Sequence, residues 1–131
     1  MSQTRQILGR WGEELAGGFL IERGYTILAT NVRTPYGEID LIVRQPGEAG
    51  DHLDSPEVTV FVEVKTRSST AYGYPEEAVT ARKQAHLLGA AQHYLQEHPE
   101  VGGDWRIDVI AIERSRVGKP PVIYHFENAV H

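Results

Sequence analysis

Three absences bound what this chain can be: it has no cysteine, no long apolar run and no excess of positive charge. Without cysteine among its 131 residues, disulfides and thiolate metal sites are excluded, and we expect a cytoplasmic protein. No apolar run approaches the roughly 18 residues of a transmembrane helix, and residues 1–6 lack the apolar core of a signal peptide, so we expect no membrane partner. The net charge is −5, whereas a non-specific nucleic-acid binder is normally basic. Any contact with nucleic acid must therefore come from a local patch or through a cation held by acidic residues.

The length and the hydrophobic periodicity predict one α/β domain that spans residues 1–131. One helix is predicted over residues 4–23, and a second begins at residue 75 or residue 80 and ends at residue 97. Strands are predicted over residues 25–32, 38–44, 58–67, 106–112 and 122–126. Residues 46–57 are rich in proline, glycine and acids, and we expect them to form a mobile loop. The order α-β-β-β-α-β-β predicts a mixed sheet with helices packed on it.

Each predicted helix carries an apolar stripe, and the residues beside the stripe suggest what approaches it. In the first helix, Gly12 lies next to the stripe, which predicts that another backbone comes close. Glu13 lies at the edge of the same stripe, so it either reaches an internal site or remains a solvated carboxylate. In the second helix, the expected buried stripe consists of small and aliphatic residues, namely Ala78, Ala81, Ala85, Leu88, Ala91 and Leu95.

The predicted strand over residues 58–67 carries the most informative pattern. Valine recurs at every second position, as a buried sheet face requires, and Glu63 and Lys65 point together from the opposite face. Because burying a lone charge costs free energy, these two residues either pair on a half-exposed strand or belong to a metal-dependent site. Asp40 interrupts the apolar run over residues 37–43 in the same way. Two acidic strands that can pair as neighbours favour the metal-dependent interpretation.

Phosphodiester hydrolysis is one reaction that such a set of residues suits. It needs a cation to neutralise the phosphate and to lower the pKa of a water molecule. Asp40, Glu63 and the main-chain carbonyl of Val64 would supply part of the oxygen shell that Mg²⁺ or Mn²⁺ prefers. Lys65 could then orient the attacking water or stabilise developing negative charge. Glu13 is a candidate to hold a water, to position Lys65 or to contribute to a second metal.

A local basic patch is the remaining route to nucleic acid. Arg82 and Lys83 fall in the N-terminal half of the second helix, and together with Arg67 they could contact phosphates. The alternative is that they are solvated surface charges. Asp108 also interrupts a strand, but we expect it to bond with Arg106 or with backbone rather than to take part in a reaction.

The spacing Asp40…Glu63-Val64-Lys65, preceded by Glu13 on a helix, resembles the PD-(D/E)xK nuclease motif. A wider set of residues resembles the YraN-like family, a bacterial group similar to Holliday-junction resolvases, and the resemblance covers nearly the whole chain. That set comprises residues 9–13, 24–25, Asn31, residues 37–40, residues 61–67, Lys83 and residues 106–109.

This resemblance implies a restriction-endonuclease-like core, in which a mixed central sheet is flanked by helices. It implies metal-binding and catalytic positions for Asp40, Glu63 and Lys65, and it makes Glu13 the helical acid. The proline that usually precedes the first motif aspartate is replaced here by Ile39. That departure leaves the ligand set intact, because proline is not a ligand.

Two hypotheses of different class follow. The first is a metal-dependent endonuclease that hydrolyses phosphodiester bonds in DNA, with branched DNA as one candidate substrate. The second is a non-catalytic nucleic-acid-binding or scaffold module that keeps the nuclease fold, which the acidic net charge and the small size favour. A homodimer is compatible with the first, because enzymes that cut branched DNA need two sites, but no interface is evident in the sequence.

Overall fold

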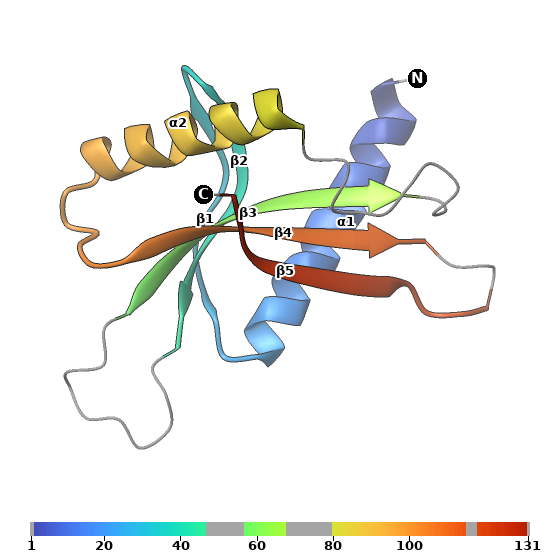
Figure 1. Ribbon diagram of the computed structural model, residues 1–131. Helices are drawn as coiled ribbons and strands as arrows, with labels where there is room; N and C mark the ends of the chain where they lie inside the picture. The colour runs from blue at the N-terminus through green and yellow to red at the C-terminus, as the bar shows by residue number, and fades with distance from the viewer. Residues whose placement is uncertain (1, 47–56, 68–79, 115–117, 131) are drawn as a thin grey trace.

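A five-stranded sheet with one helix packed on each face forms the fold (Figure 1). The computed structural model describes residues 2–46, 57–67, 80–114 and 118–130. Its elements are α1 (Ser2–Glu22), β1 (Thr26–Thr34), β2 (Gly37–Gln45), β3 (Val58–Arg67), α2 (Ala81–Glu97), β4 (Trp105–Glu113) and β5 (Val122–Val130). The predicted order α-β-β-β-α-β-β is confirmed. Most of the predicted loop at 46–57, and the earlier of the two predicted helix starts, lie outside the described residues.

The sheet is mixed, as predicted, and its strands follow one another in chain order from β1 to β5. β1 with β2, β2 with β3 and β4 with β5 are antiparallel, whereas β3 and β4 are parallel. A parallel pair needs a crossover connection, and α2 lies in the segment between β3 and β4 (Figure 1). The strand with the acid and the lysine is therefore the central one, covered on both sides.

Two separate hydrophobic cores explain why the strand sequences are so apolar. On one face, Ala16 and Leu20 of α1 pack with strand residues that include Leu41 and Val62. On the other face, α2 packs on a second cluster that includes Phe61. Burial on both faces makes a continuous apolar run favourable in a central strand. Neither described helix has the length and apolarity to cross a membrane.

The close approach predicted at Gly12 exists, but the neighbour is a side chain and not a backbone. A Cβ atom added to Gly12 would collide with Oγ1 of Thr66 on β3. Glycine at this position therefore lets α1 lie directly against the central strand. Because Glu13 is the next residue, the same contact fixes how near Glu13 comes to the sheet.

The buried face of α2 differs from the predicted stripe. Of the predicted stripe, Ala91 is buried and Leu88 and Leu95 are partly buried, but Ala81 and Ala85 are exposed, and Ala78 lies outside the described residues. The other buried residues of the helix are Leu87, Ala90 and Tyr94. Tyr94 packs edge-on against Phe61, with ring centroids 5.8 Å apart. Burying the large apolar area of the Tyr94 ring contributes more free energy than burying the small alanine side chains on which the predicted face was based. The helix is consequently rotated relative to the prediction, and this rotation determines where Lys83 points.

Candidate functional site

Asp40 and Glu63 lie opposite each other on neighbouring antiparallel strands. Leu41 pairs with Val62, and one further step in the same register brings Asp40 opposite Glu63. The backbone N–H of Val64 donates to Oδ2 of Asp40 at 2.8 Å. The Asp40 side chain thus accepts a backbone hydrogen bond at the point where the pairing of β2 with β3 ends. The two acids that the sequence singled out are brought together by strand pairing.

The protonation of Asp40 reflects this crowding of acids. Burial, and then the negative charge of Glu63, raise the pKa of Asp40 to about 7, and the charge of Glu13 acts in the same direction. The hydrogen bond from Val64 and the charge of Lys83 act in the opposite direction but do not outweigh them. A carboxylate whose charge is disfavoured by a neighbouring acid gains from a bound cation. Such perturbed groups are concentrated at functional sites.

Glu63 is almost fully buried and is approached by two lysines. Its side chain is 6% exposed, and its Oε1 atom lies 3.4 Å from the Lys65 ammonium and 3.2 Å from that of Lys83. Lys83 sits in the first turn of α2, where the hydroxyl of Thr80 accepts a hydrogen bond from its backbone N–H at 3.1 Å. The ion pair that one interpretation of the sequence predicted is therefore present. It is part of a larger cluster, because Lys83 and Asp40 join it.

The main chain of Val64 also faces the cluster. Within a strand, the N–H and C=O of one residue point to the same side. Since the N–H of Val64 points at Asp40, its carbonyl lies on the β2 side as well. Within the described ranges, no group of three or more His, Asp or Glu side chains is arranged to hold a metal ion. Two carboxylates and one carbonyl nevertheless fit a partial shell, which Mg²⁺ commonly completes with water.

Glu13 reaches the cluster from α1 through Asn31. Asn31 lies on β1 between the paired positions Thr30–Leu41 and Val32–Ile39, which places it opposite Asp40. With its amide nitrogen turned toward the acids, Asn31 donates to Glu13 at 3.2 Å and to Glu38 at 3.1 Å. Its φ of 50° is in the left-handed region, which asparagine tolerates better than most residues. Asn31 and Glu38 belong to the set that carries the family resemblance, but their place at the site was not predicted, because residue order does not reveal a backbone conformation.

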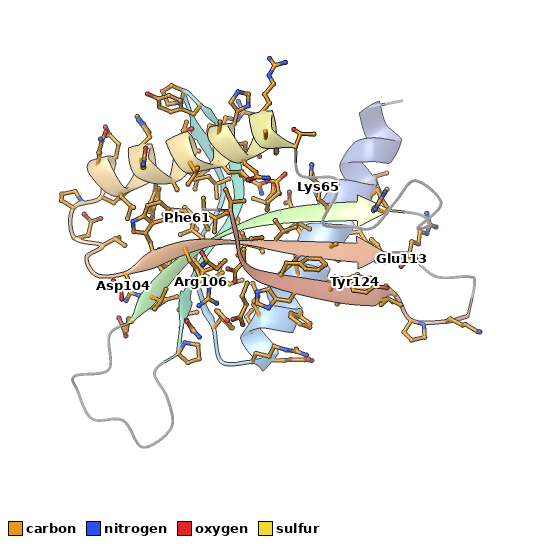
Figure 2. All side chains as sticks on the ribbon, viewed as in Figure 1. Phe61, Lys65, Asp104, Arg106, Glu113 and Tyr124 are labelled. Atoms are coloured by element: carbon orange, nitrogen blue, oxygen red, sulfur yellow. The ribbon has the colours of Figure 1, made fainter. Side chains whose placement is uncertain are left out.

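The predicted basic residues are not equally placed. Lys83 turns toward Glu63, whereas Arg82, the residue before it, is exposed on the same helix turn. Arg67 is half-buried at the end of β3, where its carbonyl accepts a hydrogen bond from the N–H of Arg114 at 2.7 Å. Figure 2 shows Lys65 in the direction of α2 and Arg106 much farther along the sheet.

A second polar cluster surrounds Asp108, and its geometry is that of a structural network. Asp108 is fully buried and accepts hydrogen bonds from Arg106 Nε at 2.9 Å and from the Asn128 backbone at 2.9 Å, and its Oδ2 lies 2.7 Å from Nε2 of His125. Burial raises the pKa of Asp108, but the bonds with His125, Arg106 and Asn128 outweigh it and leave that pKa below its usual range. The expected bonds of Asp108 with Arg106 and with backbone are confirmed.

Comparison with known proteins gives a consistent family match. The family model described as "Uncharacterised protein family UPF0102" matches residues 12–112, a span that contains every residue of the Asp40–Glu63 cluster. A UPF0102 protein of Syntrophotalea carbinolica is 43% identical over 129 residues, covering 98% of this chain and 95% of the relative. A UPF0102 protein of Pelotomaculum thermopropionicum is 40% identical over 129 residues, covering 98% of this chain and 99% of the relative. A UPF0102 protein of Syntrophomonas wolfei is 48% identical over 105 residues, covering 80% of this chain and 83% of the relative.

Proposed function

Because the chain belongs to the uncharacterised protein family UPF0102, whose description names no activity, we propose a function from the site itself: metal-dependent hydrolysis of phosphodiester bonds in DNA. The observation that carries the proposal is the convergence of Asp40 and Glu63 beside Lys65. The PD-(D/E)xK spacing in the sequence supports the same conclusion. On this proposal the chain is a restriction-endonuclease-like enzyme of the branch that resembles Holliday-junction resolvases.

The roles of the residues follow from their positions. Asp40, Glu63 and the carbonyl of Val64 would hold the ion, and its binding is favoured because it offsets the repulsion between the two neighbouring acids. A bound Mg²⁺ or Mn²⁺ would supply charge neutralisation at the phosphate and a more acidic water. Lys65 is partly exposed, with 29% of its side chain accessible, so its ammonium can reach a substrate that approaches Glu63. It would orient the attacking water or stabilise charge on the phosphate oxygens.

Glu13 and Lys83 would complete the site from the two helices. Glu13 is half-buried and held by Asn31, so it is placed to bind a water or a second cation near Asp40. Lys83 is 37% exposed in its side chain, and when a cation occupies Glu63 its ammonium would be available to a phosphate oxygen. Arg67 and Arg82 are further candidates for backbone phosphates.

Cleavage assays with isosteric variants test the proposal. Purified protein is incubated with linear, flapped and four-way DNA, each with Mg²⁺, with Mn²⁺ and with a chelator. Asp40→Asn and Glu63→Gln should each abolish metal-dependent cleavage, while Glu97→Gln, an exposed acid at the far end of α2, should cleave normally. Wild-type cleavage rates in both site variants would refute the proposal.

A specific observation favours the second hypothesis, a non-catalytic module that binds nucleic acid or acts as a scaffold. Lys65 and Lys83 already compensate the charge of Glu63, so the cluster is stable without a cation. Thermal melting separates the two functions, because a cation that binds only the folded state raises the melting temperature. A rise that Asp40→Asn removes supports the enzyme, and no rise at millimolar Mn²⁺ supports the module.

The oligomeric state belongs to the same proposal. Each chain has one Asp40–Glu63 cluster, and cutting both strands of a junction requires two. We therefore expect the enzyme to act as a homodimer on branched DNA. Light scattering of the protein alone and with a four-way junction measures this, and two chains for each bound junction is the expected ratio.

A further inference from the structure

A groove lies beside the candidate site, on the other side of Glu13. It has a volume of about 460 Å³ and is bounded by α1 and by the first two strands. Arg10, Glu13 and Gly18 of α1 form one wall, and Ile27 and Asn31 of β1 form the other. This volume is within the roughly 300–1,000 Å³ that small-ligand sites have.

The groove adjoins the carboxylate cluster through two residues. Glu13 and Asn31 both line the groove, and the same two residues contact each other through the Asn31 amide. Asn31 also lies opposite Asp40 on the neighbouring strand. A molecule that reaches Asp40 and Glu63 therefore has an adjacent hollow into which its next portion can extend.

The part of the α1 wall that contains Gly17, Gly18 and Ile21 is apolar and carries a side chain only at Ile21. Gly17 and Gly18 contribute no side chains, and a Cβ at Gly18 would meet no atom within 4 Å. Packing within the chain therefore does not require glycine at Gly18, although glycine weakens a helix interior. Ile21, 57% exposed, extends the apolar surface along the same helix face. An open apolar face of this kind suits the flat surface of a ring.

The charges in the groove select which part of a nucleotide can enter. Glu13 and Glu14 line it together with a single cation, Arg10, so a phosphate is disfavoured inside. The neutral base is accepted, because the carboxylates and the Asn31 amide can hydrogen-bond with the donors and acceptors on its edge. The phosphate then remains outside, on the side of Lys65 and Lys83, where two ammonium groups lie close together.

We propose that this groove holds an unpaired nucleobase next to the phosphodiester bond that is cut. The inference rests on the proposed function and narrows its substrate class to DNA with unpaired nucleotides, such as flaps or single-stranded ends. A base inside a duplex is stacked and paired, so it enters such a groove only after it is extruded. The protein consequently prefers flapped or single-stranded DNA to a blunt duplex of the same sequence.

Two glycines of α1 provide a matched pair of variants for the test. Gly18→Leu fills the groove, whereas Gly9→Leu adds the same side chain to the same helix outside it, and a Cβ meets nothing within 4 Å at either position. Leucine favours a helix more than glycine does, so both variants should fold. Thermal melting of both verifies this before binding is measured.

Binding is measured by fluorescence anisotropy with a labelled flapped DNA, a single strand and a blunt duplex, once in chelator and once with Ca²⁺. Gly18→Leu should weaken binding of the flap and of the single strand by about ten- to a hundredfold, the range expected for loss of one stacked base. Gly9→Leu should bind like the wild type, and neither variant should change binding of the duplex. Equal flap binding by Gly18→Leu and the wild type, or a wild type that does not prefer unpaired DNA, overturns the inference.

The experiments distinguish a wrong inference about the groove from a wrong proposal of nuclease activity. If the wild type cleaves DNA with Mn²⁺ but Gly18→Leu binds normally, the proposed function stands and the groove is not the base site. If the wild type never cleaves but Gly18→Leu alone loses single-strand binding, the groove inference stands for a binding module. Cleavage and binding are therefore recorded on the same DNA samples.

Discussion

The ammonium nitrogen of Lys83 lies 3.2 Å from Oε1 of Glu63, which ties the first turn of α2 to the central strand. Thr80 makes this contact possible, because its capping hydroxyl fixes where the helix begins. A buried carboxylate that is held by two lysines is compensated without a metal, yet each lysine can be displaced by a stronger positive charge. The relationship between Lys83 and Glu63 therefore sets both the stability of the unliganded protein and its affinity for a cation.

Replacing Lys83 should change these two properties in opposite directions. Lys83→Met removes one of the two positive charges at Glu63, so in chelator the unfolding free energy should fall by about 1 kcal/mol, a modest value because the lysine is 37% exposed. Mn²⁺ should then raise the melting temperature of the variant more than that of the wild type, since no ammonium from α2 competes for Glu63. Arg82→Met, at the neighbouring exposed position, is the control and should change neither property. Weaker cation stabilisation in Lys83→Met would contradict the argument.

Asp40 should make the metal-free protein less stable as the pH rises. Its folded-state pKa is about 7, whereas an unfolded aspartate titrates near ~3.9, so the folded state binds the proton more tightly. The stabilisation is complete below about pH 4 and is lost as the pH rises toward 7. Asp40→Asn keeps an oxygen to accept the bond from Val64 and has no charge to lose. In chelator at pH 8 it should exceed the wild type by on the order of 3 kcal/mol, and at pH 4 the two should agree.

Urea unfolding at a series of pH values measures this difference, with Glu97→Gln as the control. The control should follow the wild type at every pH, because Glu97 is exposed at the far end of α2. A gap between Asp40→Asn and the wild type that does not change with pH would mean that the Asp40 charge is not the cause. Repeating the series with Mn²⁺ should reduce the gap, since only the wild type gains a bound cation.

Asp108 should show the opposite pH dependence. Its pKa is lowered in the folded state, so its stabilisation is present above the unfolded value and disappears as the pH falls through the folded one. Asp108→Asn leaves Arg106 partly buried without its main counter-charge, and at pH 7 we expect a loss of about 3–5 kcal/mol. Glu127→Gln is the control, because Glu127 is 60% exposed and 3.9 Å from Arg106. Chemical denaturation should find a larger deficit of the Asp108→Asn variant relative to the wild type at pH 7 than at pH 3.

Strand pattern and side-chain chemistry were enough to predict much of this protein. β3 has the bounds that its alternating valines predicted, and the two acids that interrupt apolar runs, Asp40 and Glu63, are neighbours across the strands. Their pairing was predictable because a strand with a buried face allows few alternative registers with its neighbour. The family resemblance seen in the sequence agrees with the UPF0102 match, while the catalytic roles of the residues stay predictions.

The errors arose where packing decided between similar patterns. In α2 the alanines at Ala81 and Ala85 carry little apolar area, so the helix turned toward the face with Leu87 and Tyr94. Asn31 was noted in the sequence only as part of the family resemblance, because its role at the site depends on a φ of 50° and on a position opposite Asp40. Neither property is encoded in a spacing that a periodicity analysis can detect.

Gly12 provides the sharpest test of how α1 positions Glu13. Alanine is the better helix former by about 1 kcal/mol, yet its Cβ at this position would collide with Oγ1 of Thr66, so Gly12→Ala should destabilise the protein and displace α1 from β3. Thr66→Ala removes the colliding oxygen, and the double variant should recover most of the lost stability. Gly9→Ala, where nothing lies within 4 Å, should be neutral or stabilising. Because Glu13 follows Gly12 directly, the single variant should also lose metal-dependent cleavage and the double variant should regain it. A double variant as unstable as Gly12→Ala would show that the Thr66 contact does not set the distance of α1 from the sheet.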